Sequence, residues 1–455
     1  MKKYSVLGTL LLVFGACATS FGQTPEREAR IAVASGVPKM TQRKPITIDT
    51  ASPVQMTVGS SVVFDARTGG VVGAPKPFPK VMSHDNAIMP LTANANNIDG
   101  LDTLATFDGA FAAQNGPSTG QVFRFTMIGN HPQAGGATNI PAPLDEVSLT
   151  LLNADGSVFA VVPYDPFESA TLSSPNFKRS TYASGMQIQF ADAVQRAEFF
   201  NRMKANWHTN LVPAVVNRVN ITVPRFVNVQ LSDGTVVQAR SYFTGTAGDG
   251  STFVLMLDLL FNFFFDNEVV NEINLGNFTT GGLNMTLWPN TFLFSLNTAN
   301  PNSPGGCCVL GFHTYFADSS AIPQPRWVTL YASWISPGLF GAGFQDITGL
   351  SHETQESFDD PFVDNAAPVW QFPGQPANST ACQNNLEDGD PVEVLANATT
   401  TVTIGGGKRA FTYHPQNMAL YQWFEMGATS SAINGDFSFP DPTVLPASAV
   451  PCPTP

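Results

Sequence analysis

Residues 349–370 hold the side chains whose types and spacing are best suited to chemistry, because His352, Glu353 and Glu356 form the pattern H-E-x-x-E. If residues 349–358 are helical, His352 and Glu356 lie on one helix face, a turn apart. The two ligands of an H-E-x-x-H zinc site are presented in this way, with the intervening glutamate as general base. A glutamate in the second ligand position can still bind zinc through oxygen. The pattern therefore predicts a metal site with Glu353 as its base.

Two other stretches could complete this site. Glu387 and Asp390 lie in a carboxylate-rich turn, and His313 ends a Gly-Phe-His sequence just after a predicted strand. Asp360 precedes a proline, and because such a residue avoids the α region, the helix should end there. Asp360 is then placed to orient His352 from outside the ligand set, and Asp390 is assigned a similar supporting role.

As a set, these motifs resemble a group of secreted bacterial proteins that look like distant relatives of zincin peptidases. That group carries H-E-x-x-E-x-x-x-D-P, then a Trp, then E-x-x-D, then an aromatic run with Gln. The matching positions in this chain are His352, Glu353, Glu356, Asp360-Pro361, Trp370, Glu387 with Asp390, and Gln416 ahead of Trp423. A weaker similarity extends to the plant phosphate-induced (EXORDIUM-like) proteins. The resemblance covers residues 100–425.

The resemblance implies a peptidase that uses Zn²⁺ held by His352, Glu356 and a third group. The third ligand is Glu387 by analogy with proteases that use a downstream glutamate, and His313 remains the alternative. The metal would polarise a peptide carbonyl and acidify water, and Glu353 would take the proton and pass it to the leaving amine.

Other interpretations of the same residues stay open. The carboxylates of 353–364 and 387–390 could bind Ca²⁺ without any catalysis, since calcium takes six to eight oxygen ligands. The chain would then be a secreted or surface β-rich binding protein with a structural calcium or a degenerate metal site. Trp370, Tyr421 and Trp423 could serve a carbohydrate-binding surface, although such residues are more often part of a core.

The composition favours a large β-rich protein. The 455 residues are 43% hydrophobic and 13% charged, which permits a large core, and 35 Phe, 38 Gly and 35 Pro favour strands and turns over helical bundles. The net charge of -13 argues against nucleic acid as a partner, because phosphate binding needs clustered Lys and Arg. We expect one large α+β domain with a zincin-like active-site helix near 343–358, a mixed sheet, and a small N-terminal β segment as an addition.

The first residues predict export. Lys2 and Lys3 precede a short apolar run, and small residues follow it, so cleavage is expected after Ala18 or Gly22. A lipoprotein acylated at Cys17 is the weaker alternative. The apolar run and the later apolar residues 252–265 are too short to cross a bilayer. A peptide or protein substrate is therefore the expected partner, outside the cytoplasm.

The remaining predictions concern cysteines and organisation. A disulfide from Cys307 or Cys308 to Cys382 is favoured over free thiols, because adjacent cysteines rarely bond each other. A hairpin is expected at 147–162, a helix at 190–207, and a buried strand or core helix at 252–265. The expected divisions are a signal peptide (1–22), a flexible leader (23–45), an N-terminal β segment (46–99), the catalytic domain (100–425) and a Pro-rich C-terminal tail (426–455).

Overall fold

The computed structural model describes residues 103–452 except 183–184, 232, 319–324, 341–342, 376–381 and 408–409. It also describes five short strands upstream: β1 Lys39–Met40, β2 Ile46–Ile48, β3 Val63–Asp65, β4 Val71–Val72 and β5 Met82–Ser83. The predicted signal peptide, 1–22, and the leader apart from β1 lie outside the described residues. The N-terminal segment 46–99 is described only in β2 to β5.

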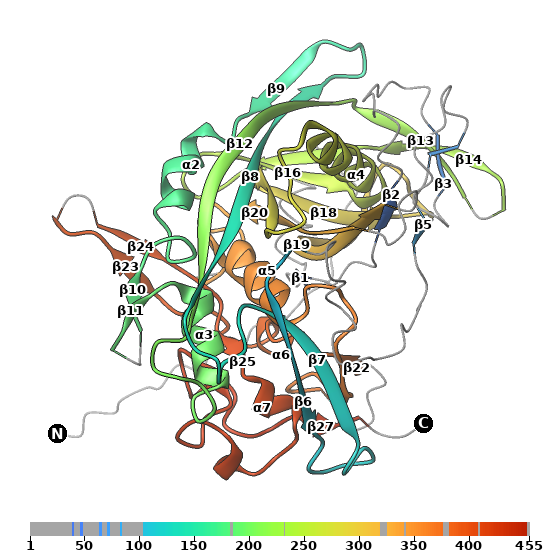
Figure 1. The fold of residues 1–455 in the computed structure, drawn as a ribbon. Helices are drawn as coiled ribbons and strands as arrows, with labels where there is room; N and C mark the ends of the chain where they lie inside the picture. The colour runs from blue at the N-terminus through green and yellow to red at the C-terminus, as the bar shows by residue number, and fades with distance from the viewer. Residues whose placement is uncertain are drawn as a thin grey trace, which may run out of the picture.

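A large mixed sheet dominates the described chain (Figure 1). Its strands run in the order β12-β8-β17-β20-β19-β18-β16-β15, with β1, β2, β5 and β9 attached beside this path. The bounds on the path are β8 Ala137–Leu152, β12 His208–Val223, β15 Tyr242–Thr246, β16 Thr252–Leu257, β17 Asn284–Pro289, β18 Thr291–Leu296, β19 Pro304–Asp318 and β20 Arg326–Trp334, and β9 is Val158–Val162. All six residues of β17 are buried, as expected for a strand with parallel neighbours on both sides and both faces covered.

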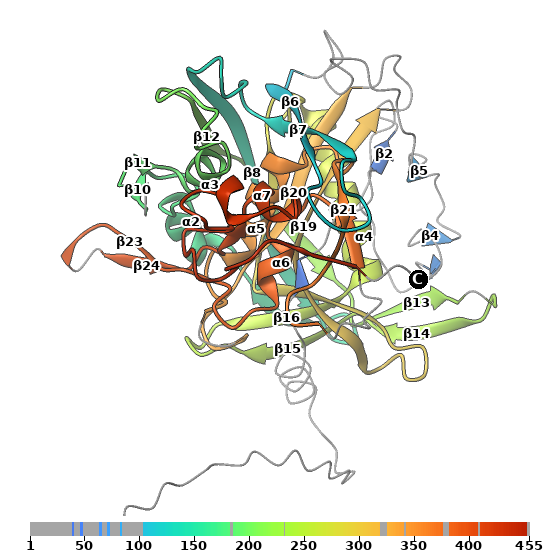
Figure 2. The same cartoon turned by 90° about the horizontal axis from the view of Figure 1, so that it is seen from below.

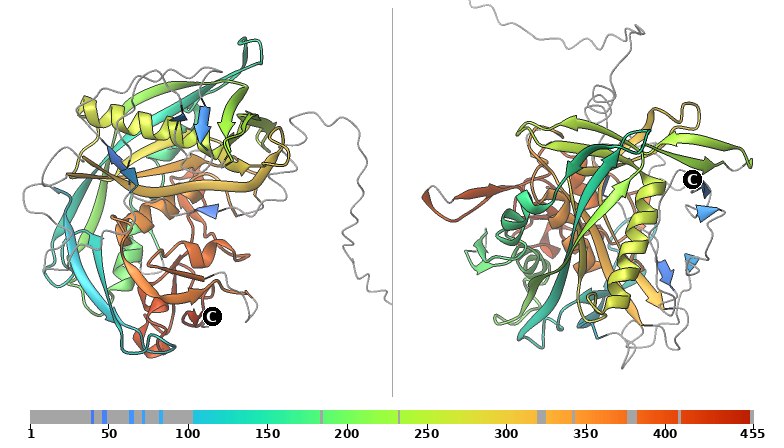
Figure 3. Two further views of the ribbon diagram at one scale, coloured as in Figure 1. Left: turned by 90° about the vertical axis from the view of Figure 1, so that its right-hand side faces the viewer. Right: turned by 90° about the horizontal axis from the view of Figure 1, so that it is seen from above.

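Two helices cover opposite faces of the sheet (Figures 1 and 3). Helix α4, Asp258–Leu275, packs its Phe261 ring 4.4 Å from Tyr331 of β20 and 6.0 Å from Phe312 of β19, measured between ring centroids. Helix α5, Thr348–Asp359, contacts β19 and β20 on the other face. Because side chains alternate along a strand, the neighbours of Phe312 in β19 point toward α5. That alternation places His313 on the α5 side.

The predicted α+β class with a zincin-like active-site helix is wrong. The structure is 42% strand and 18% helix, and it forms a large β-sheet domain. The physical reason is the length of the strand-forming segments, because β8 and β12 each run for 16 residues and pair along nearly their whole length. Helix α5 does carry the H-E-x-x-E residues. It is a short element packed on this sheet, however, and not the organising helix of a zincin-like fold.

Smaller elements surround this framework. The other helices are α2 Asp165–Leu172, α3 Phe190–Glu198, α6 Asp390–Glu393, α7 Tyr421–Phe424 and the 3₁₀ turn η2 Thr429–Ser431. The other strands are β6 Thr106–Ala112, β7 Val122–Ile128, β10 Ser180–Thr181, β11 Gln187–Ile188, β13 Phe226–Gln230, β14 Val236–Arg240, β21 Ala366–Gln371, β22 Cys382–Asn385, β23 Val402–Ile404, β24 Phe411–Tyr413, β25 Met418–Ala419, β26 Ser438–Phe439 and β27 Val450–Pro451. Seen from below, α5, α6 and α7 overlap near the centre of the view (Figure 2), and Figure 1 shows α6 beneath α5 and α7 beneath α6.

Several local predictions are confirmed. Strands β8 and β9 form the expected antiparallel hairpin around Asn153. The helix expected at 190–207 is α3, which ends earlier, at Glu198. The apolar residues 252–265 combine both alternatives, since strand β16 runs directly into helix α4. In the described part of the chain, no helix is long and apolar enough to cross a bilayer.

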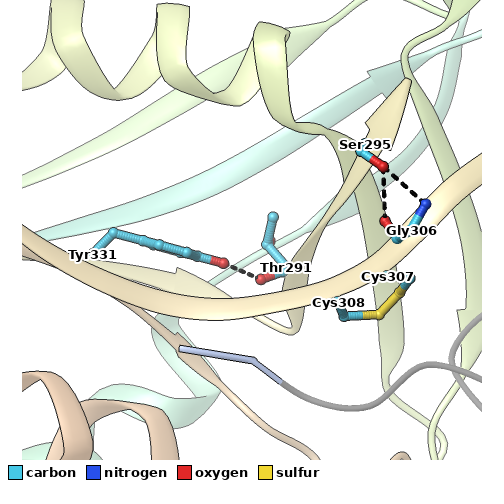
Figure 4. Close-up of a disulfide and its surroundings, with 6 residues drawn as sticks. All are labelled: Thr291, Ser295, Gly306, Cys307, Cys308 and Tyr331. Atoms are coloured by element: carbon cyan, nitrogen blue, oxygen red, sulfur yellow. Dashed lines mark hydrogen bonds between the residues drawn. A yellow bond between two sulfur atoms is a disulfide. The ribbon is translucent and has the colours of Figure 1, made fainter. Parts of the chain in front are cut away.

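The predicted cysteine pairing is wrong. Adjacent residues Cys307 and Cys308 form one disulfide in β19 (Figure 4), and Cys382 pairs with Cys452. The second bridge arises because β27 pairs with β21, which also pairs with β22, so the end of the chain lies beside Cys382. Residues 426–452, expected as a Pro-rich tail, therefore pack against the body of the protein.

Candidate metal centre

Helix α5 brings His352 and Glu356 together as their spacing predicts. The helix ends at Asp359, and the amide of Asp360 still donates to the carbonyl of Glu356 at 2.7 Å before Pro361 follows. Every residue of α5 is buried, because the sheet covers one side and α3 contacts another. Within the helix, Nε2 of His352 lies 2.9 Å from Oε1 of Glu356.

Gln416 holds the other ring nitrogen of His352. Its Oε1 lies 3.1 Å from Nδ1 of His352, its Nε2 donates to the carbonyl of Gly389 at 2.7 Å, and its own amide donates to Ser351 Oγ at 2.9 Å. A histidine ligand whose second nitrogen is held in this way has its ring orientation fixed. The amide side chain of Gln416 therefore does for His352 what Asp360 was expected to do.

His313 and Glu387, the two alternatives for the third ligand, both lie in the site. Nδ1 of His313 is 3.4 Å from Oε2 of Glu353 and 3.6 Å from Oε2 of Glu356. Its Nε2 is 3.9 Å from Oε1 of Glu387. From the sequence these two residues are alternatives, whereas the structure brings both of them close to Glu356.

Asp390 lies close to His352, whereas Asp360 accepts hydrogen bonds from the chain that follows the helix. Oδ1 of Asp390 is 3.9 Å from Nε2 of His352, and its Oδ2 accepts a hydrogen bond of 2.6 Å from Gln383. The amides of residues 389 and 390 both donate to Oε1 of Glu356 at 3.2 Å, which fixes this loop to α5. Asp360 accepts the amides of Asp364 and Asn365, at 2.9 and 3.0 Å, and so shapes the chain after the helix.

The site is fully buried and contains polar atoms without hydrogen bonds. Among the described residues, no hydrogen-bond partner reaches either ring nitrogen of His313 or any carboxylate oxygen of Glu353 and Glu387. Two groups of possible ligands share Glu356, one with His313 and Glu353 and one with His352 and Asp390, and within each group the ligand atoms lie within 4.8 Å of one another. Buried polar atoms without hydrogen bonds are costly, so a set of them that converges fits a bound cation.

Burial and mutual repulsion displace the pKa values of these groups. Burial would lower the pKa of His313, but Glu353 and Glu356 outweigh it and raise that pKa to about 10. Burial acts to raise the pKa of Glu356, yet the charges of His352 and His313 bring it down to about 2. Burial raises the pKa of Glu353 to about 7. Burial, reinforced by neighbouring carboxylates, also raises the pKa of Glu387 well above its ordinary value.

The nitrogen and oxygen donors define which metals fit. Two imidazoles with carboxylates suit zinc and other first-row transition metals, whereas calcium prefers oxygen ligands alone. The aromatic residues Trp370, Tyr421 and Trp423 lie in the core, at 2% exposure or less, so they form no surface platform.

Two glycines, which the sequence analysis did not assign to the site, make room for its side chains. A Cβ on Gly311 would lie 2.7 Å from both Cγ and Oε1 of Glu353, and one on Gly389 would lie 2.5 Å from Nδ1 of His352. Both stand inside motifs already identified, Gly-Phe-His and the turn around 387–390. Both glycines are therefore visible in the sequence. Their role in making room for Glu353 and His352 becomes clear only when it is known which segments lie next to each other.

Comparison with family models, curated proteins and solved structures gives no significant match for this chain.

Proposed function

We propose that the chain is an exported metal-dependent hydrolase, a peptidase that uses Zn²⁺ and takes Glu353 as its general base. Export is inferred from the N-terminal sequence, and the two disulfides are consistent with an oxidising compartment. The observation that supports the hydrolase most directly is the convergence of buried, unpaired ligand atoms around Glu356, contributed by β19, α5 and the loop before α6.

Each residue has a defined part in the proposed reaction. His352, Glu356, His313 and Glu387 would hold the metal, and a metal there supplies Lewis acidity toward a peptide carbonyl. Water adds to the carbonyl carbon while Glu353 accepts a proton from it. As the carbon–nitrogen bond breaks, Glu353 returns that proton to the leaving amine, so it ends the cycle as it began.

Zinc is favoured over calcium because the site contains two histidines. Imidazole nitrogen is a common zinc ligand, whereas calcium sites in proteins are built from carboxylate, carbonyl and water oxygens. Gln416 adds to this argument, since its amide oxygen faces Nδ1 of His352 and accepts a hydrogen bond from an N–H there, which leaves Nε2 as the nitrogen with a free lone pair.

The test is the metal content of the mature protein, residues 23–455, purified without added metal. We expect about one zinc per chain, its loss in His313→Ala and Glu356→Ala, and its retention in His208→Ala. His208 is a suitable control because it pairs with Asp192 of α3 at 2.8 Å and belongs to neither group of possible metal ligands. A peptide library is then screened with Glu353→Gln, which should keep zinc and lose hydrolysis.

A second function is favoured by one observation, the complete burial of the site. Each ligand candidate in β19 and α5 is 0% exposed, and a substrate needs access. A non-catalytic binding protein stabilised by a metal would need none. Zinc retained without hydrolysis of any library peptide would favour this function, and absence of bound metal would remove the hydrolase proposal.

A further inference from the structure

A second group of buried carboxylates lies beside the candidate metal centre. Glu198 is the last residue of α3, Asp359 is the last residue of α5, and Asp388 lies in the loop between β22 and α6. One carboxylate oxygen from each lies within 4.8 Å of the others, and all three side chains are 0% exposed. Three chain segments thus direct carboxylates to one point inside the protein.

Most of these oxygens lack a hydrogen bond. Both oxygens of Glu198, both of Asp388 and Oδ2 of Asp359 have no partner among the described residues. Oδ1 of Asp359 accepts from Gln355 at 3.3 Å, and the backbone amide of Tyr421 faces Glu198. Three carboxylates buried side by side are stable only if they are protonated or if a cation compensates their charge.

The compensating charge does not come from a basic side chain in the described chain. No Lys or Arg there forms an ion pair with any of the three carboxylates, and the histidine charge that acts on Asp388 is that of His352, in the first site. Two glutamines adjoin the cluster. Gln422 donates to the carbonyl of Glu198, Gln355 donates to Asp359, and the amide oxygen of each has no partner.

We propose that Glu198, Asp359 and Asp388 bind a Ca²⁺ ion in a site separate from the one at His352. The converging ligand atoms are all carboxylate oxygens, with no nitrogen or sulfur among them, and an oxygen-only site suits calcium better than zinc. Glu198 and Asp359 are also helix C-terminal residues, where the partial negative charge of the helix end favours a cation.

The ion connects the segments that build the first site. Asp388 lies between Glu387 and Asp390, and Asp359 lies one turn after Glu356 in α5. Calcium at this point would fasten the loop 386–390 to the end of α5 and to α3. It would therefore hold Glu387 in position without touching substrate, as a structural ion.

The experiment uses the full mature chain, stripped with a chelator and titrated with Ca²⁺ alone, and Zn²⁺ content is measured in parallel on samples that were not stripped. We expect about one Ca²⁺ per chain and a rise in Tm on calcium addition. Both effects should disappear in Glu198→Gln and in Asp388→Asn, while the unstripped variants retain more zinc than Glu356→Ala does. Glu268→Gln is the control, because Glu268 is a buried carboxylate near Glu272 on α4.

The metal-free variants give a second readout. If the carboxylates repel one another, Glu198→Gln without calcium should have a Tm equal to or above that of the stripped wild type. The proposal is overturned if stripped wild-type protein binds no Ca²⁺ and its Tm does not change when calcium is added. It is equally overturned if Glu356→Ala abolishes calcium binding and Glu198→Gln does not, because the ion would then occupy the first site. Absence of zinc from the unstripped wild type, together with calcium binding that depends on Glu198 and Asp388, would overturn the proposed hydrolase and leave this site standing.

Discussion

Replacing Gly389 by alanine should weaken metal binding by displacing the ring of His352. A Cβ at this position would lie 2.5 Å from Cε1 and Nδ1 of His352 and 2.8 Å from Nε2. Because non-bonded atoms settle at about 3.5–4.0 Å, the ring must move by about 1 Å. The backbone itself tolerates alanine, since Gly389 has φ -78° and ψ -39°, in the right-handed helical region. The effect therefore isolates the position of one ligand.

The magnitude follows from how tightly that ring is held. His352 is fully buried and lies between Glu356 at 2.9 Å and Gln416 at 3.1 Å, so it has no free direction in which to move. Overpacking of this kind costs about 1–3 kcal/mol of stability, and a misplaced ligand costs about 10–100-fold in metal affinity.

The assay is a zinc competition titration against a chromogenic chelator, with Tm measured on the same samples. Gly406→Ala is the matched control, because a Cβ there meets nothing within 4 Å, and it should change stability by less than about 0.5 kcal/mol. Wild-type zinc affinity in Gly389→Ala would refute the claim that His352 binds the metal from its present position.

Three further substitutions test other parts of the structure. Gly311→Ala should lower kcat by about 10-fold or more, because its Cβ would lie 2.7 Å from Oε1 of Glu353, the proposed base. Its zinc content should be unchanged. A loss of zinc as large as the loss of kcat would contradict the assignment of Glu353 as a base and not a ligand. Cys382→Ser should destabilise the protein by up to about 4 kcal/mol, since the bridge to Cys452 closes a loop with a sequence separation of 70; a Tm within 1 °C of wild type would show that the bridge contributes little. Glu425→Gln should remove a pH-dependent loss of stability. Burial raises the pKa of Glu425 to about 7, so the protonated form favours folding below pH 4.5 and that stability is lost as pH rises through 7. The Tm difference between variant and wild type should therefore grow by on the order of 2 °C from pH 5 to pH 8.

Local periodicity predicted individual elements well and the fold class poorly. The hairpin at Asn153 and helix α3 follow from turn residues and apolar spacing, which act over a few residues. The breadth of the sheet does not, because β8, β17 and β20 become neighbours only through parallel pairing between distant segments. The H-E-x-x-E motif correctly predicted a helix, α5. The fold class, however, is determined by the large sheet on which this helix packs.

The sequence allowed the residues of the candidate site to be predicted, but not how they are arranged relative to one another. His352 and Glu356 follow from helical geometry, since residues four apart share a face. The position of His313 next to them depends on the register of β19 against β20 and on the packing of α5 across both strands, and neither has a local sequence signal. The predicted disulfide pairing was wrong for the same reason. The pairing of Cys452 with Cys382 depends on strand β27, which the sequence did not indicate.

Whether a substrate can reach the buried metal centre distinguishes the proposed enzyme from the alternative, a non-catalytic binding protein. Strand β1, in the predicted leader, pairs with β19 at Val309 and Gly311 and contacts α5 and α6. An extended substrate added at this edge of β19 would run beside His313 and Glu353, because strand addition uses backbone groups that β1 now engages.

A chain beginning at residue 46 should therefore hydrolyse library peptides faster than one beginning at residue 23, with equal zinc content. A synthetic peptide covering 36–45 should inhibit the shorter chain when added back, and a scrambled peptide of the same composition should not. Equal rates in the two chains would show that β1 does not cover the substrate edge. No hydrolysis by either, with zinc bound in both, would mean that burial of the metal centre is its working state and that the metal serves a binding protein.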